Sequence, residues 1–283
     1  MNQTKTFFLM VVLTIIFVAL GSMIGGRDGG MIAFFIALVM NFISYWFCDK
    51  IVLKMYRAQE VSEAEAPQLH AMVSALAQKA SIPMPRVYII ENDSPNAFAT
   101  GRSPSKGVVA VTTGIMRILS REELEGVLAH EISHIKHRDI LIQTVAATLA
   151  GAITMIANFA RFTAFFGGGS NDDEGRGNIF SVIIFSMLAA FAAMLIQLAI
   201  SRSREYMADD RGAQLSGNPL YLAGALKKLT LGVARSPMND ANPSTAPLFI
   251  VNPFSAKGII TLFSTHPPIE ERIKRLEDMA YRR

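Results

Sequence analysis

Two histidines and a glutamate, His130, Glu131 and His134, stand in an H-E-x-x-H pattern. The residues around them favour a helix, and on a helix the residues i and i+4 project from the same face about one turn apart. Two imidazoles placed in this way can both bind one Zn²⁺, and the glutamate between them can take a proton from the metal's water. The alternative is a helix that exposes two histidines and a solvated carboxylate.

A catalytic zinc needs a third protein ligand and an open position for water. His137 is nearest in sequence, but on a continuous helix it lies roughly 10 Å from His130, which is too far for one tetrahedral ion. Glu205 is the better candidate because Asp209 follows it four residues later. A helix would then present one carboxylate to the metal and the other to the free N–H of a ligating histidine. Taken alone, this spacing also fits a charged, solvated helix face.

Four windows without any charged residue separate the polar parts of the chain, at residues 6–26, 29–48, 140–160 and 177–201. Each is about as long as a helix that crosses a bilayer, so we expect four transmembrane helices. The first window follows Lys5 as a signal peptide would, but it has no A-x-A-like cleavage site, and a retained anchor is expected. Two crossings between His134 and Glu205 return the chain to the same side of the membrane, so one metal can bind both.

The amino-acid composition excludes several classes of protein. The chain of 283 residues is 51% apolar and only 18% charged, which excludes a disordered chain and argues against an ordinary cytosolic domain. The single cysteine, Cys48, excludes an intrachain disulfide framework and a cysteine-based zinc cluster. Lys and Arg concentrate in residues 49–139 and 201–283, so the positive-inside rule places both segments, and both termini, in the cytoplasm. The net charge of +4 therefore indicates membrane topology and contact with the lipid bilayer, and no nucleic-acid partner is expected.

The polar segments carry their own folding patterns. Ser120 and Glu123 form a predicted capping box that starts the helix holding the H-E-x-x-H residues. Three β-rich runs at 86–91, 97–101 and 108–112 predict a small antiparallel sheet. The expected fold is a mainly α integral membrane protein with four transmembrane helices and an α+β cytosolic domain. Its parts are a transmembrane hairpin (1–49), a cytosolic region with the H-E-x-x-H helix (50–139), a second transmembrane hairpin with an external Gly-rich loop (140–200), and a cytosolic region with the third ligand (201–283).

Four stretches, in this order, carry a family resemblance: PNAFATG, HEISHIKHRD, SRSREYMADDRGA and STHPPIEERI. Together they resemble the HtpX membrane-bound zinc metalloproteases, which belong to the gluzincin family that includes the CAAX prenyl endopeptidases. The resemblance covers nearly the whole chain. It implies one Zn²⁺ per chain, held by His130, His134 and Glu205, with Glu131 as the base. It also implies a role in quality control at the bacterial inner membrane, with misfolded membrane proteins as substrates.

Two further assignments depend mainly on this resemblance. Asn96, Ala97 and Phe98 would form an edge strand against which an extended substrate pairs through backbone hydrogen bonds. The alternative for these three is an ordinary turn. His266 would hydrogen-bond the oxyanion of the transition state or, equally well, cap the closing helix before Pro267.

A membrane scaffold or chaperone-like protein that binds zinc or unfolded segments without cleaving them is the rival interpretation. A protein that only binds zinc or unfolded segments has no need of a base at Glu131. A zinc transporter is a poor alternative because the four charge-free windows contain no His, Asp or Glu. The sequence leaves the oligomeric state open.

Overall fold

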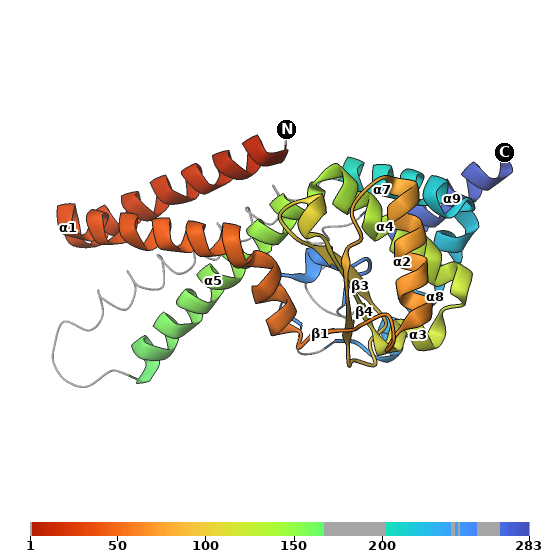
Figure 1. The fold of residues 1–283 in the computed structure, drawn as a ribbon. Helices are drawn as coiled ribbons and strands as arrows, with labels where there is room; N and C mark the ends of the chain where they lie inside the picture. Colours follow the sequence, from red (N-terminus) through yellow and green to blue (C-terminus); the bar gives the residue numbers. More distant parts are fainter. Residues whose placement is uncertain (1, 167–201, 239–240, 243, 254–266, 283) are drawn as a thin grey trace.

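The computed structural model describes residues 2–166, 202–238, 241–242, 244–253 and 267–282. These residues divide into an apolar helical part and an α+β part (Figure 1). The apolar part consists of α1 (Asn2–Met55) and α5 (Asp139–Phe166). The α+β part consists of β1 (Gln59–Glu60), α2 (Pro67–Ala80), β2 (Arg86–Ile90), β3 (Ala97–Thr100), η1 (Pro104–Lys106), β4 (Val108–Thr112), α3 (Thr113–Ile118), α4 (Arg121–His137), α7 (Arg202–Ser216), α8 (Pro219–Arg235), η2 (Ala246–Leu248) and α9 (Ile269–Tyr281).

The long helix α1 is a hairpin whose second arm runs back beside the first (Figure 1). The turn falls in the G-G-R-D-G-G stretch, where Gly26 has a φ of +58°, a conformation that glycine adopts without cost. Near the turn the two arms touch through backbone, since a Cβ on Gly29 would collide with the carbonyl oxygen of Gly21. Farther along, the Asn41 amide donates a hydrogen bond of 2.9 Å to the Thr14 hydroxyl, which ties the arms together.

The outer surface of this hairpin is apolar. α5 packs against both arms through buried residues such as Leu13, Cys48 and Leu149, whereas Phe7 and Phe35 are 70% and 61% exposed. Of the described residues, one helix, Gly26–Met55, is long and apolar enough to cross a membrane, with a mean hydropathy of 2.0. Two further apolar helices, Thr6–Ser22 and Asp139–Thr154, are shorter. The fourth expected helix, at 177–201, lies outside the described residues, so four transmembrane helices stay a prediction.

The sheet has the strand order β1-β2-β4-β3. β3 pairs antiparallel with β4, but β2 and β4 are parallel, so the prediction of an antiparallel sheet was wrong for the central pair. The chain reverses direction between β2 and β3 and again between β3 and β4. β2 and β4 therefore point the same way, and β3 lies at the edge. Turn residues indicate the reversals, but they do not indicate which strands become neighbours.

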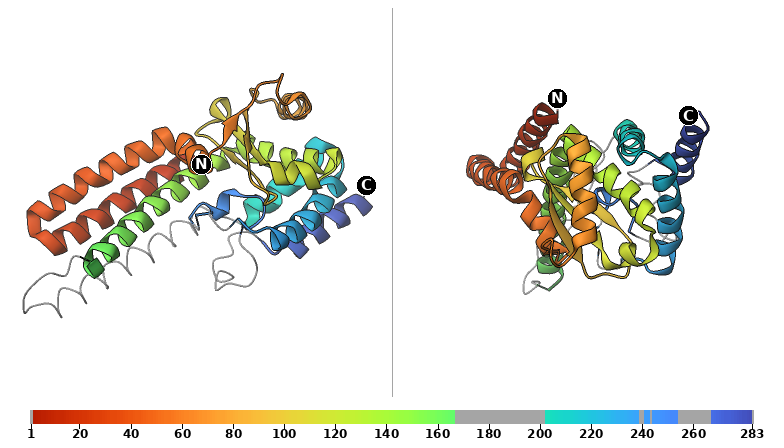
Figure 2. Two further views of the ribbon diagram at one scale, coloured as in Figure 1. Left: turned by 90° about the horizontal axis from the view of Figure 1, so that it is seen from below. Right: turned by 45° about the vertical axis from the view of Figure 1, so that its right-hand side comes forward.

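The two faces of the sheet are covered by different parts of the chain. Val87, Ala99 and Val111 belong to the core that α2 and α4 share on one face. Tyr88 and Phe98 belong to a second core on the opposite face, which is completed by the end of α1 and by Met238, Ala241, Leu248 and Phe249. Figure 2 shows the sheet between the apolar helices and the helices of the α+β part. β3 thus separates the H-E-x-x-H helix from the end of the apolar hairpin.

The predicted capping box at the start of α4 is confirmed. Ser120 Oγ accepts a hydrogen bond from the Glu123 backbone N–H at 3.3 Å, and the Glu123 carboxylate accepts one from the Ser120 N–H at 2.7 Å. Both bonds satisfy N–H groups that would otherwise lack a partner at the start of the helix. α4 then continues without interruption to His137, past all three residues of the H-E-x-x-H pattern.

Candidate metal centre

The middle of α4 holds His130, Glu131 and His134 in a buried position. These three residues are at most 5% exposed because α7, α8 and β3 pack around this helix. The Nε2 atoms of the two histidines face each other at 3.1 Å. This is the geometry that two residues four apart on one helix can reach.

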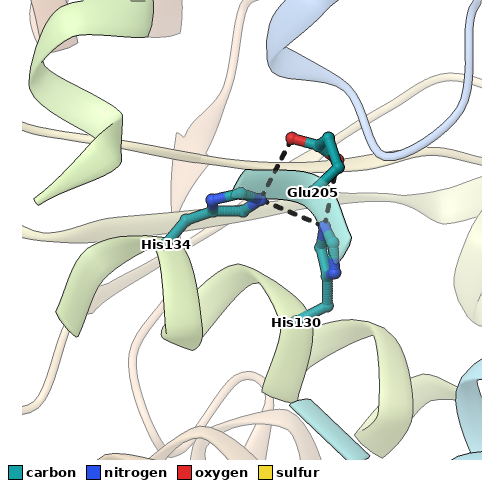
Figure 3. Close-up of side chains that lie close together, drawn as sticks. All are labelled: His130, His134 and Glu205. Atoms are coloured by element: carbon teal, nitrogen blue, oxygen red, sulfur yellow. Dashed lines mark hydrogen bonds and ion pairs between the residues drawn. The ribbon is translucent and has the colours of Figure 1, made fainter. Parts of the chain in front are cut away.

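α7 brings a carboxylate to these imidazoles. It approaches α4 closely at Gly212, where a Cβ would lie only 3.0 Å from the backbone N and Cα of His130. Two turns earlier in α7, Glu205 lies 2% exposed, with Oε1 at 3.5 Å from His134 Nε2 and Oε2 at 3.7 Å from His130 Nε2 (Figure 3). The structure therefore brings the third expected ligand to the first two.

These three side chains fit a zinc ion. The three ligand atoms lie within 4.8 Å of one another. A tetrahedral zinc with bonds of about 2.0–2.1 Å separates its ligand atoms by about 3.3 Å. The two Nε2 atoms are 3.1 Å apart, and each lies 3.5 or 3.7 Å from one of the two Glu205 oxygens, so the closest separations between the three side chains are near this value. Two imidazoles and one carboxylate are also a donor set of catalytic zinc sites.

A buried ion pair orients His130. Asp209 Oδ1 lies 2.9 Å from His130 Nδ1, on the side of the ring away from Glu205. Arg272 of α9 donates two hydrogen bonds to the Asp209 carboxylate, of 2.8 and 2.7 Å, and is itself 0% exposed. Burial alone would raise the pKa of Asp209, but Arg272 and the bond to His130 outweigh burial and lower it well below its usual value. Asp209 is therefore a permanent anion that fixes which nitrogen of His130 faces the metal position.

His134 has a weaker partner of the same kind. Asp139 Oδ2 lies 3.6 Å from His134 Nδ1, which is within ion-pair range but too long for a hydrogen bond. Burial alone would lower the pKa of His134, but Glu205 and Asp139 outweigh it and raise the pKa to about 9. A protonated imidazole cannot bind a metal, so metal binding at this site must expel that proton.

Glu131 lies beside the ligands with its carboxyl group 3% exposed. Burial raises the pKa of Glu131 to about 8, while nearby His134 and the backbone N–H of Ala99 oppose this shift. A carboxyl group with a pKa near neutrality can both accept and return a proton at physiological pH.

Comparison with known proteins shows to which family the chain belongs. A sequence profile described as Peptidase family M48 matches residues 63–280. The chain belongs to this family. It is therefore a metallopeptidase, an enzyme that hydrolyses peptide bonds.

Similar proteins extend over the whole chain. A protein named "Protease HtpX homolog" from Thermodesulfovibrio yellowstonii is 60% identical over 282 residues, which is 100% of both chains. One with the same name from Pyrococcus furiosus is 58% identical and covers 98% of this chain and 95% of its own. The predicted resemblance to the HtpX proteases is confirmed.

A solved structure shows the same fold at low identity. The crystal structure of S. mikatae Ste24p matches with a TM-score of 0.53 and 18% identity, over 98% of this chain. The chain spans 65% of the length of Ste24p. At this identity the match shows the fold alone.

Two residues at the M48 site escaped the sequence analysis, Arg272 and Asp139. Arg272 lies three residues after Ile269 and four before Leu276, on the apolar side of α9. A charged residue at that position is the one signal that could have found it, since a buried arginine needs a buried partner. Asp139 gives no such signal because it follows α4 as an ordinary first residue of α5.

The other expected site residues have different outcomes. Asn96, Ala97 and Phe98 lie at the edge of the sheet, but each is at most 1% exposed. His137 Nδ1 donates a hydrogen bond of 2.7 Å to the Ser133 carbonyl on its own helix, and His137 is not among the three side chains that group around the metal position. His266 lies outside the described residues, so both of its expected roles stay predictions.

Proposed function

We propose that the chain is a zinc endopeptidase of the bacterial inner membrane that cleaves misfolded or damaged membrane proteins at the cytoplasmic face. The observation that carries this proposal is the convergence of His130, His134 and Glu205 beside the buried Glu131. Relatives named "Protease HtpX homolog", at up to 60% identity, support the peptidase chemistry. The positive-inside pattern supports the orientation, with both termini in the cytoplasm.

The residues divide the work of hydrolysis. A zinc ion held by His130, His134 and Glu205 would polarise the scissile carbonyl and acidify a water. Glu131 accepts the proton of the attacking water and returns it to the leaving amide nitrogen. Asp209 holds the His130 ring in the orientation that its Nε2 needs, and Arg272 holds Asp209.

The position of the site supports membrane-protein substrates. α5 begins at Asp139, five residues after His134, so the ligand helix leads directly into the apolar part of the molecule. We assign residues 1–49 and 140–200 to the two membrane hairpins, and residues 50–139 and 201–283 to the two halves of the peptidase domain. A polypeptide that emerges from the bilayer would therefore meet the metal within a short distance of the surface.

The substrate is expected to bind as an extended strand. β3, with Ala97 and Phe98, is the edge strand of the sheet and lies directly over α4. Backbone pairing with an edge strand accepts many sequences, which suits an enzyme that removes damaged proteins. Asn96 adds a side-chain amide at the start of this strand, and His266 keeps its two expected roles, in oxyanion binding or in capping α9.

The decisive test replaces Glu131 by glutamine in the purified, zinc-loaded full chain. Glu131→Gln is expected to abolish cleavage of casein or of a misfolded membrane protein while zinc stays bound, because the amide keeps the shape and loses the proton acceptor. Glu125→Gln, at an ion-paired position near the surface of the same helix, is the matched control and should keep full activity. A fully active Glu131→Gln enzyme would end this account.

The rival, a membrane scaffold that binds zinc or unfolded chains without cleaving them, gives the opposite result. It predicts no chelator-sensitive cleavage by the unmodified chain, and no difference between the two glutamine variants. The buried Glu131 beside the ligands argues against it, because burial of a carboxyl group is costly and a site that only binds zinc gains nothing from it.

A further inference from the structure

The cleft in front of the ligands is closed by the chain itself. Residues 246–251, here called the cleft segment, run from η2 along the edge of β3. Pro247, Leu248, Phe249 and Ile250 form one wall of the cleft, opposite the two histidines, Glu131 and Glu205. The remaining free volume is about 10 Å³, which is room for about one water molecule and for no peptide.

The cleft segment uses the edge of β3 that a substrate strand needs. β4 takes one edge of β3, and Phe249 pairs with Phe98 across the other in an antiparallel bridge. The Ile250 N–H donates a hydrogen bond of 3.0 Å to the Ala97 carbonyl. The Asn96 amide donates one of 3.0 Å to the Val251 carbonyl. These are the backbone and side-chain contacts that strand addition to a sheet edge would use.

The side chains of the cleft segment fill pockets on both faces of the sheet. Phe249 packs against the rings of Tyr56 and Phe98, with ring centroids 5.0 and 5.3 Å away; these two rings also contact each other, at 6.0 Å, and all three side chains are buried. Ile250 points to the opposite face and belongs to the core around α4. The Tyr56 hydroxyl, at the end of the apolar hairpin, hydrogen-bonds the Thr245 hydroxyl just before the segment.

One guanidinium joins the cleft segment to the metal centre. Arg272, which holds Asp209 through two hydrogen bonds, donates a third of 3.2 Å to the Ile250 carbonyl. The same buried cation thus contacts the partner of a ligand and the backbone of the segment. An extended substrate in that place would offer Arg272 a carbonyl of its own.

We propose that the cleft segment is a pseudosubstrate, which must leave β3 before a substrate can bind. The site that it vacates takes an extended peptide antiparallel to β3, with a large apolar side chain, aromatic by preference, packed against Tyr56 and Phe98 in the place of Phe249. This inference rests on the proposed function, because it names the substrate class and the restraint of that same site. An apolar cavity lined by Met40, Ile43 and Thr245 borders the segment on the side of the membrane helices, where an apolar chain would enter.

The first test measures peptide binding without catalysis. The probe is a fluorescein-labelled peptide with the sequence of residues 244–252, and its scrambled form is the control ligand. Both are added to the full-length Glu131→Gln chain, which does not need to cleave them. Ile250→Pro removes the N–H that donates to Ala97, and Phe249 before it already has the extended backbone that a following proline requires. Ile250→Ala keeps the N–H and removes the side chain, so it is the matched variant.

Both variants lose the buried Ile250 side chain, which should release the cleft segment and tighten peptide binding relative to the unmodified chain. The Ile250→Pro chain also loses the hydrogen bond to Ala97, so it should bind the peptide about fivefold more tightly than the Ile250→Ala chain. The scrambled peptide should not respond to either variant. Equal peptide affinity in all three chains would overturn the proposal, since the segment would then be a fixed strand and not a competitor. In the active enzyme the same proline should raise the rate of cleavage at low substrate concentration by a similar factor.

A cross-link gives a second test that does not depend on proline. Phe98→Cys and Phe249→Cys place two thiols at the bridged pair, where facing side chains come closest, in a chain with Cys48→Ala. The oxidised form is expected to bind the peptide at least tenfold more weakly than the reduced form of the same protein, and cleavage should return with reductant. Tight binding by the oxidised form would overturn the pseudosubstrate while leaving the peptidase assignment intact. Conversely, an active Glu131→Gln enzyme would overturn the mechanism and leave the binding result standing.

Discussion

The metal centre and the edge of β3 are both buried, but different forces hold them. The centre is fixed by charge: Asp209 lies between His130 and Arg272 with three contacts of 2.9 Å or less. The edge is held mainly by neutral contacts, namely one backbone hydrogen bond, an amide contact and apolar packing around Phe249, with one further hydrogen bond of 3.2 Å from Arg272 to the Ile250 carbonyl. Removing one partner of a buried charge costs several kcal/mol, whereas one neutral hydrogen bond contributes about 1 kcal/mol. The chemistry therefore lies on a rigid frame, and access to it depends on a part that is easier to displace.

Glu205→Ala should have the largest effect, and it should act on the metal centre alone. The bound zinc should fall from one ion per chain to near zero, and activity should fall to background, because two imidazoles from one helix turn hold a catalytic zinc poorly without a third ligand. Metal analysis of the purified protein, alongside the cleavage assay, checks both results. A variant that keeps one zinc per chain would show that Glu205 is not a ligand.

Replacing Arg272 tests whether the two regions are coupled. Arg272→Ala leaves Asp209 as an uncompensated buried anion and should destabilise the domain by about 3–5 kcal/mol. It also removes the donor to the Ile250 carbonyl, so zinc affinity and retention of the cleft segment should fall together. Arg272→Lys keeps the charge but loses the planar, two-pronged hydrogen bonding of the guanidinium. Its stability and zinc affinity should therefore lie between those of the Arg272→Ala chain and those of the unmodified chain.

Thermal unfolding and zinc competition measure the effects of these Arg272 variants. Asp209→Asn is the comparison, because it should lower zinc affinity about 10–100-fold with little effect on the segment. Equal loss of segment pairing in Asp209→Asn would contradict a direct role of Arg272 at the cleft segment.

The helical residues of the centre could be predicted from sequence because local rules specify them. The Ser120 capping box starts α4, and a spacing of four residues puts His130 and His134 on one face. The same spacing joins Glu205 to Asp209, and an even number of membrane crossings permits Glu205 to reach the histidines. Each inference depends on residues close in sequence or on counting segments.

The remaining features depend on contacts between distant residues. No local pattern indicates that β2 and β4 are parallel, that Phe249 pairs with Phe98, or that Arg272 reaches across 63 positions to Asp209. Residues 235–257 are rich in Pro, Asn and Ser, a composition typical of an irregular loop, and the described part of this stretch contains the segment that fills the cleft. Pairing with β3 organises residues 246–251, and their composition does not indicate this pairing.

The pH dependence of stability tests the raised pKa of Glu131. Burial raises its pKa from 4.5 to about 8, so the folded chain holds a proton that the unfolded chain has lost between these pH values. The contribution of Glu131 to stability is therefore most favourable below pH 4.5 and falls as the pH rises towards 8, by on the order of 2–3 kcal/mol at pH 7. In chelator-treated protein, Glu131→Gln removes this cost, so its melting temperature should exceed that of the unmodified chain by much more at pH 8 than at pH 5. An equal difference at both pH values would contradict a protonated Glu131.

The smallest expected effect concerns the pairing at the edge of β3 and not the metal centre. Asn96→Ala removes the donor to the Val251 carbonyl and the acceptor for the Ala97 N–H, at a position 0% exposed. It should weaken the pairing of the cleft segment by about 1 kcal/mol, because the lost bonds are neutral. Faster amide hydrogen exchange at Ile250 and Val251 would show this, while zinc affinity should stay within twofold of that of the unmodified chain. Asn92→Ala, which removes a local turn contact to the Ser94 N–H, is the matched control and should leave exchange at both residues unchanged. If Asn96→Ala lowered zinc affinity as strongly as Asp209→Asn does, the edge and the centre would be one unit, and the difference in their rigidity would not exist.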